Sequence, residues 1–235
     1  MSPLRRLLQI VIAALPLAAV ALAQTGFPSE NESLHYNINW PGGLGIGKAV
    51  LTARKSASGW DFEMSLSGSI PGFSVTDQFH ASATADLCST AFERDLSQGR
   101  RDSREKTTFD QRTGRAHRLT LFPADGGYTD FDIPSCARDV LTFVYFARRE
   151  LGQGRVPPAQ QVYYGGTYTI RMENTGAQTI TVGKKPVVTD HVLARFKGQK
   201  SSADFDVFFA RDAARTPLSI KVPLSAGAFS LELVR

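Results

Sequence analysis

The sequence predicts a mainly β protein in which a single antiparallel, curved sheet, half-barrel or barrel-like, packs against one α-helix around residues 136–151. Two observations predict this class. Apolar and polar side chains alternate with a period of two along most of the chain, which is typical of strands with one buried face. Only one segment carries apolar residues at helical spacing. Because no long linker or solenoid repeat divides the chain, we expect residues 24–235 to form one domain.

The alternation begins in residues 34–40 and ends at the turn Pro41-Gly42-Gly43. It returns in residues 60–67. A third run repeats it at Phe73, Val75, Asp77 and Phe79. Later runs are separated by turns, for which Arg112-Thr113-Gly114 and Asn174-Thr175-Gly176 are candidates. These runs are residues 50–55, 104–109, 115–122, 168–173, 178–182, 187–196, 205–210, 218–222 and 229–234.

The helical segment has its own start and stop signals. Ser135 can cap the helix, Arg148 and Arg149 suit its last turn, and Gly152 stands just beyond. Its apolar stripe is broad, so it must pack against something large, and the concave face of the curved sheet is the obvious partner. The stripe consists of Val140, Leu141, Phe143, Val144, Ala147 and Leu151.

The start of the chain has the pattern of a cleavable signal peptide over residues 1–23. Arg5 and Arg6 precede an uncharged apolar stretch, and Ala21-Leu22-Ala23 is a small-x-small cleavage site. The stretch is short for a bilayer span and contains Pro16, so we expect no integral membrane span after cleavage. No cysteine lies near the cut to carry a lipid. The expected product is a soluble periplasmic protein.

Composition excludes several classes of protein. The chain is 42% hydrophobic and 21% charged, which is ordinary for a globular protein and argues against disorder. The formal charge of +5 falls to +3 when Arg5 and Arg6 leave with the signal peptide, too little to indicate nucleic-acid binding. The basic residues between Arg94 and Arg104 are mixed with acids and lack interleaved aromatic residues, so a solvated strand face is favoured.

Cys88 and Cys136 are the two cysteines of the chain. In an oxidising compartment a disulfide between them is the natural hypothesis, and it would close a loop of about 48 residues, stabilising the fold by about 4 kcal/mol. Two free buried thiols are the alternative. Metal binding is disfavoured because neither cysteine has a second cysteine or a histidine at ligand spacing, and no cofactor is predicted.

No motif names a reaction. Residues 42–48 have the spacing of a phosphate-binding loop, but Ala49 replaces the magnesium-binding hydroxyl and a strand follows instead of a helix, so a Gly-rich hairpin is favoured. No Gly-x-Ser-x-Gly occurs. Asp190 and His191 point to opposite faces of a strand, and Asp204 with Asp206 is explained by a solvated edge. Surface positions are favoured for the isolated histidines, which are His35, His80, His117 and His191.

Three motifs in order give the chain a family resemblance. Residues 32–40 with 47–51 form the first, residues 138–148 the second, and residues 208–220 the third. Together they resemble the exported bacterial family called domain of unknown function 3108, although Phe208-Phe209 stands where that family commonly has Trp. The resemblance spans nearly the whole mature chain. It implies the fold and the compartment, and no activity.

The same motifs contain residues that need a physical account. Asp139 suits the helix N-terminus, and Tyr145 with Arg148 lies on neighbouring helical positions. We favour an ion pair that links the helix to the sheet, with ligand binding as the alternative. In the third motif Asp212, Arg215 and Pro217 read as hairpin chemistry, with Pro217 fixing the turn exit and Arg215 binding carbonyl groups.

Two hypotheses of function remain, with a third beside them. The first is a non-enzymatic envelope protein that holds an apolar ligand or a protein partner between sheet and helix, with Phe143, Tyr145 and Phe146 lining the cavity. The second is a hydrolase acting on envelope glycan or peptide, which requires a histidine within reach of a serine or carboxylate in a cleft. A scaffold for protein assembly is the third.

Overall fold

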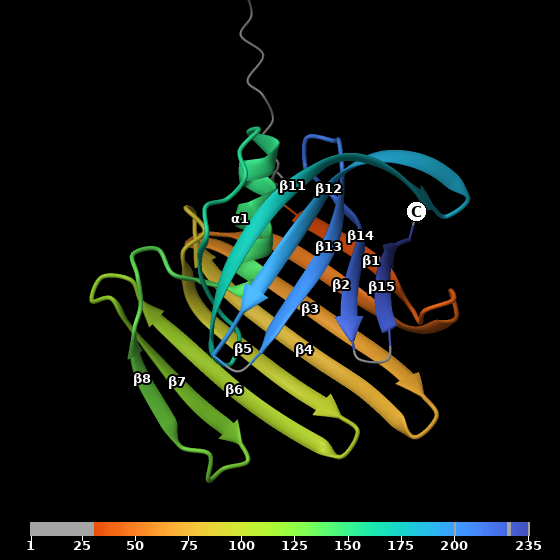
Figure 1. The fold of residues 1–235 in the computed structure, drawn as a ribbon. Coiled ribbons are helices and arrows are strands. Elements are labelled where there is room, and N and C mark those ends of the chain that lie inside the picture. The colour runs from red at the N-terminus through yellow and green to blue at the C-terminus, as the bar shows by residue number, and fades with distance from the viewer. Residues whose placement is uncertain (1–30, 200, 225–226, 235) are drawn as a thin grey trace, which may run out of the picture.

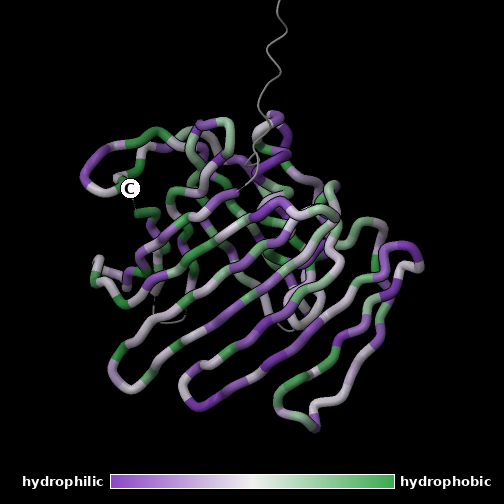
Figure 2. The backbone as a smooth tube through the Cα atoms, turned by 180° about the vertical axis from the view of Figure 1, so that it is seen from behind, coloured by the Kyte–Doolittle hydropathy of each residue, from purple (hydrophilic) through white to green (hydrophobic). Residues whose placement is uncertain are grey.

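The structure is a computed structural model that describes residues 31–199, 201–224 and 227–234. The predicted signal peptide, residues 1–23, lies outside the described residues. Within them the chain forms one sheet of fifteen strands and one helix, α1 (Val140–Gly152), which confirms the mainly β class and the single helix. Hydrophobic and hydrophilic residues alternate along many of the strands, as the period-two pattern requires (Figure 2).

The first eight strands are β1 (Asn31–Asn39), β2 (Gly45–Ser56), β3 (Gly59–Ile70), β4 (Phe73–Thr84), β5 (Ser89–Gln98), β6 (Arg101–Asp110), β7 (Arg115–Phe122) and β8 (Tyr128–Asp132). The strands on either side of α1 and after it are β9 (Arg138–Asp139), β10 (Gln160–Tyr163), β11 (Thr167–Val182), β12 (Lys185–Lys197), β13 (Ser202–Ala210), β14 (Pro217–Leu224) and β15 (Gly227–Leu233). The alternation predicted most of these, and it missed β5, β8, β9 and β10.

The strand order shows two meanders joined at a seam. Strands β1 to β8 follow one another across one half of the sheet, and β15 back to β9 form the other half. The halves meet where β1 pairs with β15, with Tyr36 opposite Leu233. Every pairing is antiparallel except that of β9 with β10. The sheet is open, and its two edges are β8 and β9.

The sheet curls so that its two halves face each other. Strands β11 to β13 arch across the face of β3 to β5, with α1 near one end of the curve (Figure 1). Tyr164, in the turn between β10 and β11, lies with its ring centre 5.8 Å from that of Phe79 on β4. The short edge strand β9 reaches β5, where the Ser89 amide donates to the Ala137 carbonyl at 3.0 Å. We call the face that α1 covers the inner face.

The helix begins four residues later than predicted. Its N-cap is Asp139, not Ser135, and the carboxylate accepts from the amides of Leu141 and Thr142 at 2.8 and 3.0 Å. The residues before it cannot be helical, because Cys136 has a φ of 55° and Arg138-Asp139 pairs with β10 as strand β9. The helix ends at Gly152 with Gln153 as its C-cap, one residue beyond the predicted end at residue 151.

The core fills the space between α1 and the inner face. The Tyr145 ring stacks on Phe62 of β3 with centres 4.3 Å apart, and both side chains are buried. One large cluster of buried apolar residues joins α1 to both halves of the sheet. Because Phe62 faces the helix, the period of two places Met64 and Leu66 on the same inner face.

Two glycine-bearing segments behave differently from each other. Residues 41–44 form the predicted turn, and Gly47 within β2 comes so close to β3 that an added Cβ would lie 2.2 Å from the Ser67 carbonyl oxygen. Asn174-Thr175-Gly176, predicted as a turn, is instead a bulge inside the continuous strand β11. A bulge adds one residue to a strand and bends the strand without ending it. Its sequence, Asn-Thr-Gly, therefore resembles that of a turn.

Cys88 and Cys136 form a disulfide, which confirms the predicted pairing. The bridge joins the turn between β4 and β5 to the segment that leads into β9 and α1. It therefore fixes the start of the helix to the opposite half of the sheet.

Candidate functional site

Beyond the helix, the inner face carries apolar side chains that folding leaves only partly buried. They pack against the edge of the main core and come from both halves of the sheet. We call this region the open end, and the region around α1 the closed end. Its first wall consists of Met64, Leu66 and Leu96, on β3 and β5. Its second wall consists of Phe196, Phe205, Ile220 and Val222, on β12 to β14.

Strand register places a charged residue in the first wall. Asp77 on β4 pairs with Leu66 on one side and with Leu96 on the other, so its side chain shares their inner face. Only 6% of Asp77 is exposed. Its Oδ2 accepts a hydrogen bond from Gln98 Nε2 at 2.7 Å, whereas its Oδ1 is buried and accepts none from the described residues. Burial is the main cause that raises the pKa of Asp77.

An ion pair lies next to Asp77 on the same face. Arg94 Nε and Nη2 approach Glu105 Oε2 at 3.0 and 2.9 Å, and both side chains are 17% exposed. The Arg94 guanidinium also lies 5.3 Å from the centre of the Tyr164 ring. Gly165, with a φ of +62°, fits against Arg94 because a Cβ there would lie 2.2 Å from the guanidinium carbon. The turn between β10 and β11 therefore closes over this pair.

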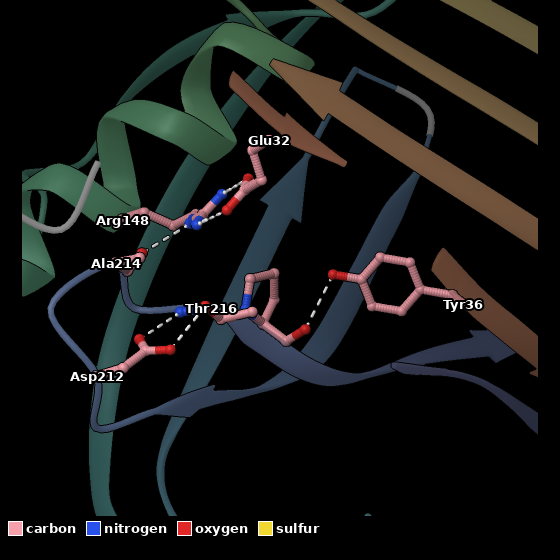
Figure 3. Close-up of polar contacts among 7 residues, drawn as sticks. Glu32, Tyr36, Arg148, Asp212, Ala214 and Thr216 are labelled. Atoms are coloured by element: carbon pink, nitrogen blue, oxygen red, sulfur yellow. Dashed lines mark hydrogen bonds and ion pairs between the residues drawn. The ribbon is translucent and has the colours of Figure 1, made fainter. Parts of the chain in front are cut away.

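The closed end contains a second, more deeply buried ion pair. Arg148 on α1 donates from Nη1 and Nη2 to the two Glu32 oxygens at 2.6 and 2.7 Å, and from Nε to the Ala214 carbonyl at 3.0 Å (Figure 3). The Arg148 side chain is fully buried. Burial alone would lower its pKa, but the bonds to Glu32 raise it. The pair links α1 to β1, as the favoured interpretation of Arg148 expected.

Asp139 holds the other end of the helix. Its Oδ2 accepts from the hydroxyls of Ser89 and Thr142 at 2.5 and 2.7 Å, in addition to the two helix amides at Oδ1. The side chain is fully buried, and burial raises its pKa. Asp139 is thus a hydrogen-bonded cap that ties β5 to α1, and it belongs to no ion pair in the described residues.

The third motif shapes the connection between β13 and β14. Asp212 accepts from the Thr216 amide and hydroxyl at 3.0 and 2.8 Å, and the Tyr36 hydroxyl donates to the Pro217 carbonyl at 2.9 Å (Figure 3). Arg215 differs from the prediction. Its guanidinium pairs with Asp190 at 2.5 Å instead of binding carbonyl groups, and its backbone has a positive φ of 47°.

The three aromatic residues predicted to line a cavity lie at the closed end. Phe143, Tyr145 and Phe146 are 3%, 0% and 8% exposed, which makes them part of the packed core. The Arg138 guanidinium stacks on the Phe146 ring at 3.7 Å. Burial, followed by the charge of Arg149, lowers the pKa of Arg138 to about 10. The open end, which the structure adds, was not singled out from the sequence.

The four histidines lie on separate strands. His191 is the one with the most contacts, since its Nε2 lies 2.7 Å from Asp206 Oδ1 and its Nδ1 2.6 Å from the Thr175 hydroxyl. His117 lies 2.7 Å from Asp130 on an exposed surface. Asp190 binds Arg211 and Arg215 on the face opposite His191, as predicted.

Two clefts lie outside the open end. One of about 460 Å³ is lined by residues 132–138 and 159–161, beside the disulfide. The other, of about 90 Å³, lies near the end of α1 between Leu151, Arg155, Asp190 and Arg215. None of the four histidines lines either cleft. Among the described residues there is no group of three metal-ligating side chains, and no described helix has the length and hydropathy of a membrane span.

Fold and site together define a class: a mainly β protein whose open, curved sheet encloses one helix and a partly exposed apolar interior. The family profile described as "Protein of unknown function (DUF3108)" matches residues 34–234, so the chain belongs to that family, as its three motifs indicated. None of the curated proteins matches this sequence.

Solved structures that align with the chain include the following two. A β-barrel-like protein of domain of unknown function DUF1849 from Brucella abortus aligns with a TM-score of 0.62 at 9% identity, over 86% of this chain and 95% of that one. This likeness supports the fold alone. The lipoprotein LppX from Mycobacterium tuberculosis covers 86% of this chain and 84% of its own at 14% identity, with a TM-score of 0.27. At that score it carries no argument.

Proposed function

We propose that the protein is exported to the periplasm and binds an apolar ligand at the open end, without catalysing a reaction. One observation carries the proposal: apolar side chains on two facing walls of one concave surface remain partly exposed after folding. Apolar side chains that stay partly open to solvent on a concave face are typical of ligand-binding sites. The disulfide is compatible with export, because such bonds persist in oxidising compartments.

The closed end gives the open end a fixed shape. Tyr145 stacks on Phe62, and Met64 and Leu66 continue along the same face of β3. In this proposal Phe143, Tyr145 and Phe146 form the packed floor toward which an apolar chain would extend. Their direct contact with a ligand stays a prediction. A protein partner that covers the same walls would also be apolar at its contact surface.

The hydrolase alternative has less support. It needs a histidine near a nucleophile or carboxylate inside a cleft. His191 has the partners, but it is absent from the lining of both clefts, and the opposite face of its strand carries the adjacent Asp190 with Arg211 and Arg215.

Fluorescence of N-phenyl-1-naphthylamine, an uncharged apolar probe, tests the proposal. We expect the purified protein to enhance its emission, and Leu66→Gln and Phe205→Gln, one from each wall, each to weaken binding by about tenfold, since each removes apolar contact area. The matched control is Val188→Gln, because Val188 on β12 is 51% exposed and lies outside both walls. Binding that is absent, or that Val188→Gln weakens as much as the wall variants do, would reject the open end as the site.

A further inference from the structure

The apolar walls of the open end enclose one buried acceptor that has no donor. Asp77 lies between Leu66 and Leu96, and its Oδ1 has no hydrogen-bond donor among the described residues. A buried carboxylate oxygen without a donor costs a folded protein free energy, and native structures rarely keep one. Because Asp77 lies among the wall residues, a bound ligand can supply the hydrogen-bond donor that Oδ1 lacks.

The neighbouring charges do not fill this role. Arg94 commits its Nε and Nη2 to Glu105 and stacks on Tyr164. The Arg118 guanidinium, two strands farther, donates to the Gly165 carbonyl. Gln98 already donates to the other oxygen of Asp77. The cations of this surface therefore have partners. The Ser97 amide and the Arg94 charge act on Asp77 and lower its pKa, but no described group donates to Oδ1 within hydrogen-bond distance.

We propose that the open end selects amphiphiles whose polar end donates hydrogen bonds, such as a hydroxyl, an amide or an ammonium group, and that Asp77 Oδ1 accepts from that group. The inference rests on the proposed function and adds the chemistry of the ligand's polar end. A carboxylate or phosphate head is disfavoured, because it lacks a donor when ionised and meets the charges of Asp77 and Glu105. Because Oδ1 is buried, a donor that reaches it removes a larger desolvation cost than a donor to an exposed carboxylate would.

Three ligands with the same twelve-carbon chain separate the head group from the tail. Dodecan-1-ol, dodecylamine and dodecanoate are each titrated against protein that holds N-phenyl-1-naphthylamine, below their micellar concentrations. We expect the alcohol and the amine to displace the probe at concentrations about tenfold lower than dodecanoate does, the size of effect that one hydrogen bond to a charged group produces. Asp77→Asn, which keeps the shape of the side chain, should reduce that ratio to within about threefold.

The outcomes distinguish the two proposals. If the wild-type protein fails to bind the probe, the proposed function fails, and this inference fails with it. If the probe binds and all three ligands displace it equally, or dodecanoate displaces it best, ligand binding at the open end stands and the role of Asp77 is overturned. The wild-type comparison needs no variant, so the test holds even if Asp77→Asn folds poorly. As a matched control, Asp132→Asn, an exposed acid on β8, should leave the ratio unchanged.

Discussion

The two ends of the interior differ in how completely their buried carboxylates are hydrogen-bonded. At the closed end Arg148 has Glu32 and a carbonyl as partners, and Asp139 receives four hydrogen bonds. At the open end the apolar walls stay partly exposed, and Asp77 keeps one oxygen without a donor. If the proposed function holds, one curved sheet provides stability at one end and a binding site at the other. Natural proteins commonly concentrate such unsatisfied features where they bind ligands.

Removing the charge of Arg148 tests the closed end most severely. Arg148→Met keeps an unbranched apolar stem but leaves Glu32 without its partner, and we expect a loss of about 3–5 kcal/mol in the free energy of unfolding. Urea denaturation measures it. The matched control is Arg195→Met, whose pair with Glu173 is 45% and 56% exposed and should contribute at most about 1 kcal/mol. Equal losses in both variants would show that the closed end is not the stabilised region.

The disulfide is the second test of the closed end. Cys88→Ser combined with Cys136→Ser should cost about 3–4 kcal/mol, because the bridge spans 48 residues and restricts the unfolded chain. Wild-type protein under strong reductant is the control, since the chain has two cysteines and both are in the bridge. The two should unfold at the same urea concentration. A loss below about 1 kcal/mol would mean that hydrogen bonds alone fix the start of α1.

Asp77→Asn should change stability in the other direction. The folded-state pKa of Asp77 is raised, mainly by burial, so ionising it costs stability. That cost is absent below the unfolded-state pKa of about 3.9, grows as pH rises from there to the folded-state pKa, and is complete above it. We therefore expect the variant to be more stable than wild type by about 1 kcal/mol at pH 7, with the gain gone below about pH 4.

Thermal or urea unfolding across pH measures this gain. Asp132→Asn serves as control, because an exposed acid with a weak surface pair should change stability by less than about 0.5 kcal/mol. A variant less stable than wild type at pH 7 would indicate that Asp77 is a structural residue, and the contrast between the two ends would disappear.

The sequence predicted the fold well for a physical reason. A half-buried sheet must alternate apolar and polar residues, so the pattern in residues 34–40 or 60–67 is a direct consequence of the fold. Strands β5 and β10 were not predicted because charged and polar residues interrupt their apolar–polar alternation. The bulge at Thr175 was predicted as a turn because its residues are typical of turns. The predicted start of α1 was wrong because the disulfide and the pairing of β9 with β10 hold the preceding residues in a non-helical conformation.

The candidate site was harder to predict from the sequence than the fold, although the sequence contains part of the evidence for it. Asp77 stands on the apolar phase of its strand, between Val75 and Phe79, and Arg94 does the same between Phe92 and Leu96. A charge on the buried phase is unfavourable unless it has a purpose, so these positions could have been singled out. The pair of Glu32 and Arg148 could not, because 116 residues separate them and nothing local relates one to the other.

The seam between β1 and β15 has a consequence for how the chain becomes folded. Each meander forms from neighbouring hairpins, but Tyr36 meets Leu233 only after almost the whole chain is available. Closing so long a loop is entropically costly, and contacts of this kind slow folding. Until β15 is available to pair, β1 lacks one of its two neighbouring strands, and the two halves of the sheet are not joined. The sheet is thus completed only late in synthesis, a delay that would suit the export proposed above.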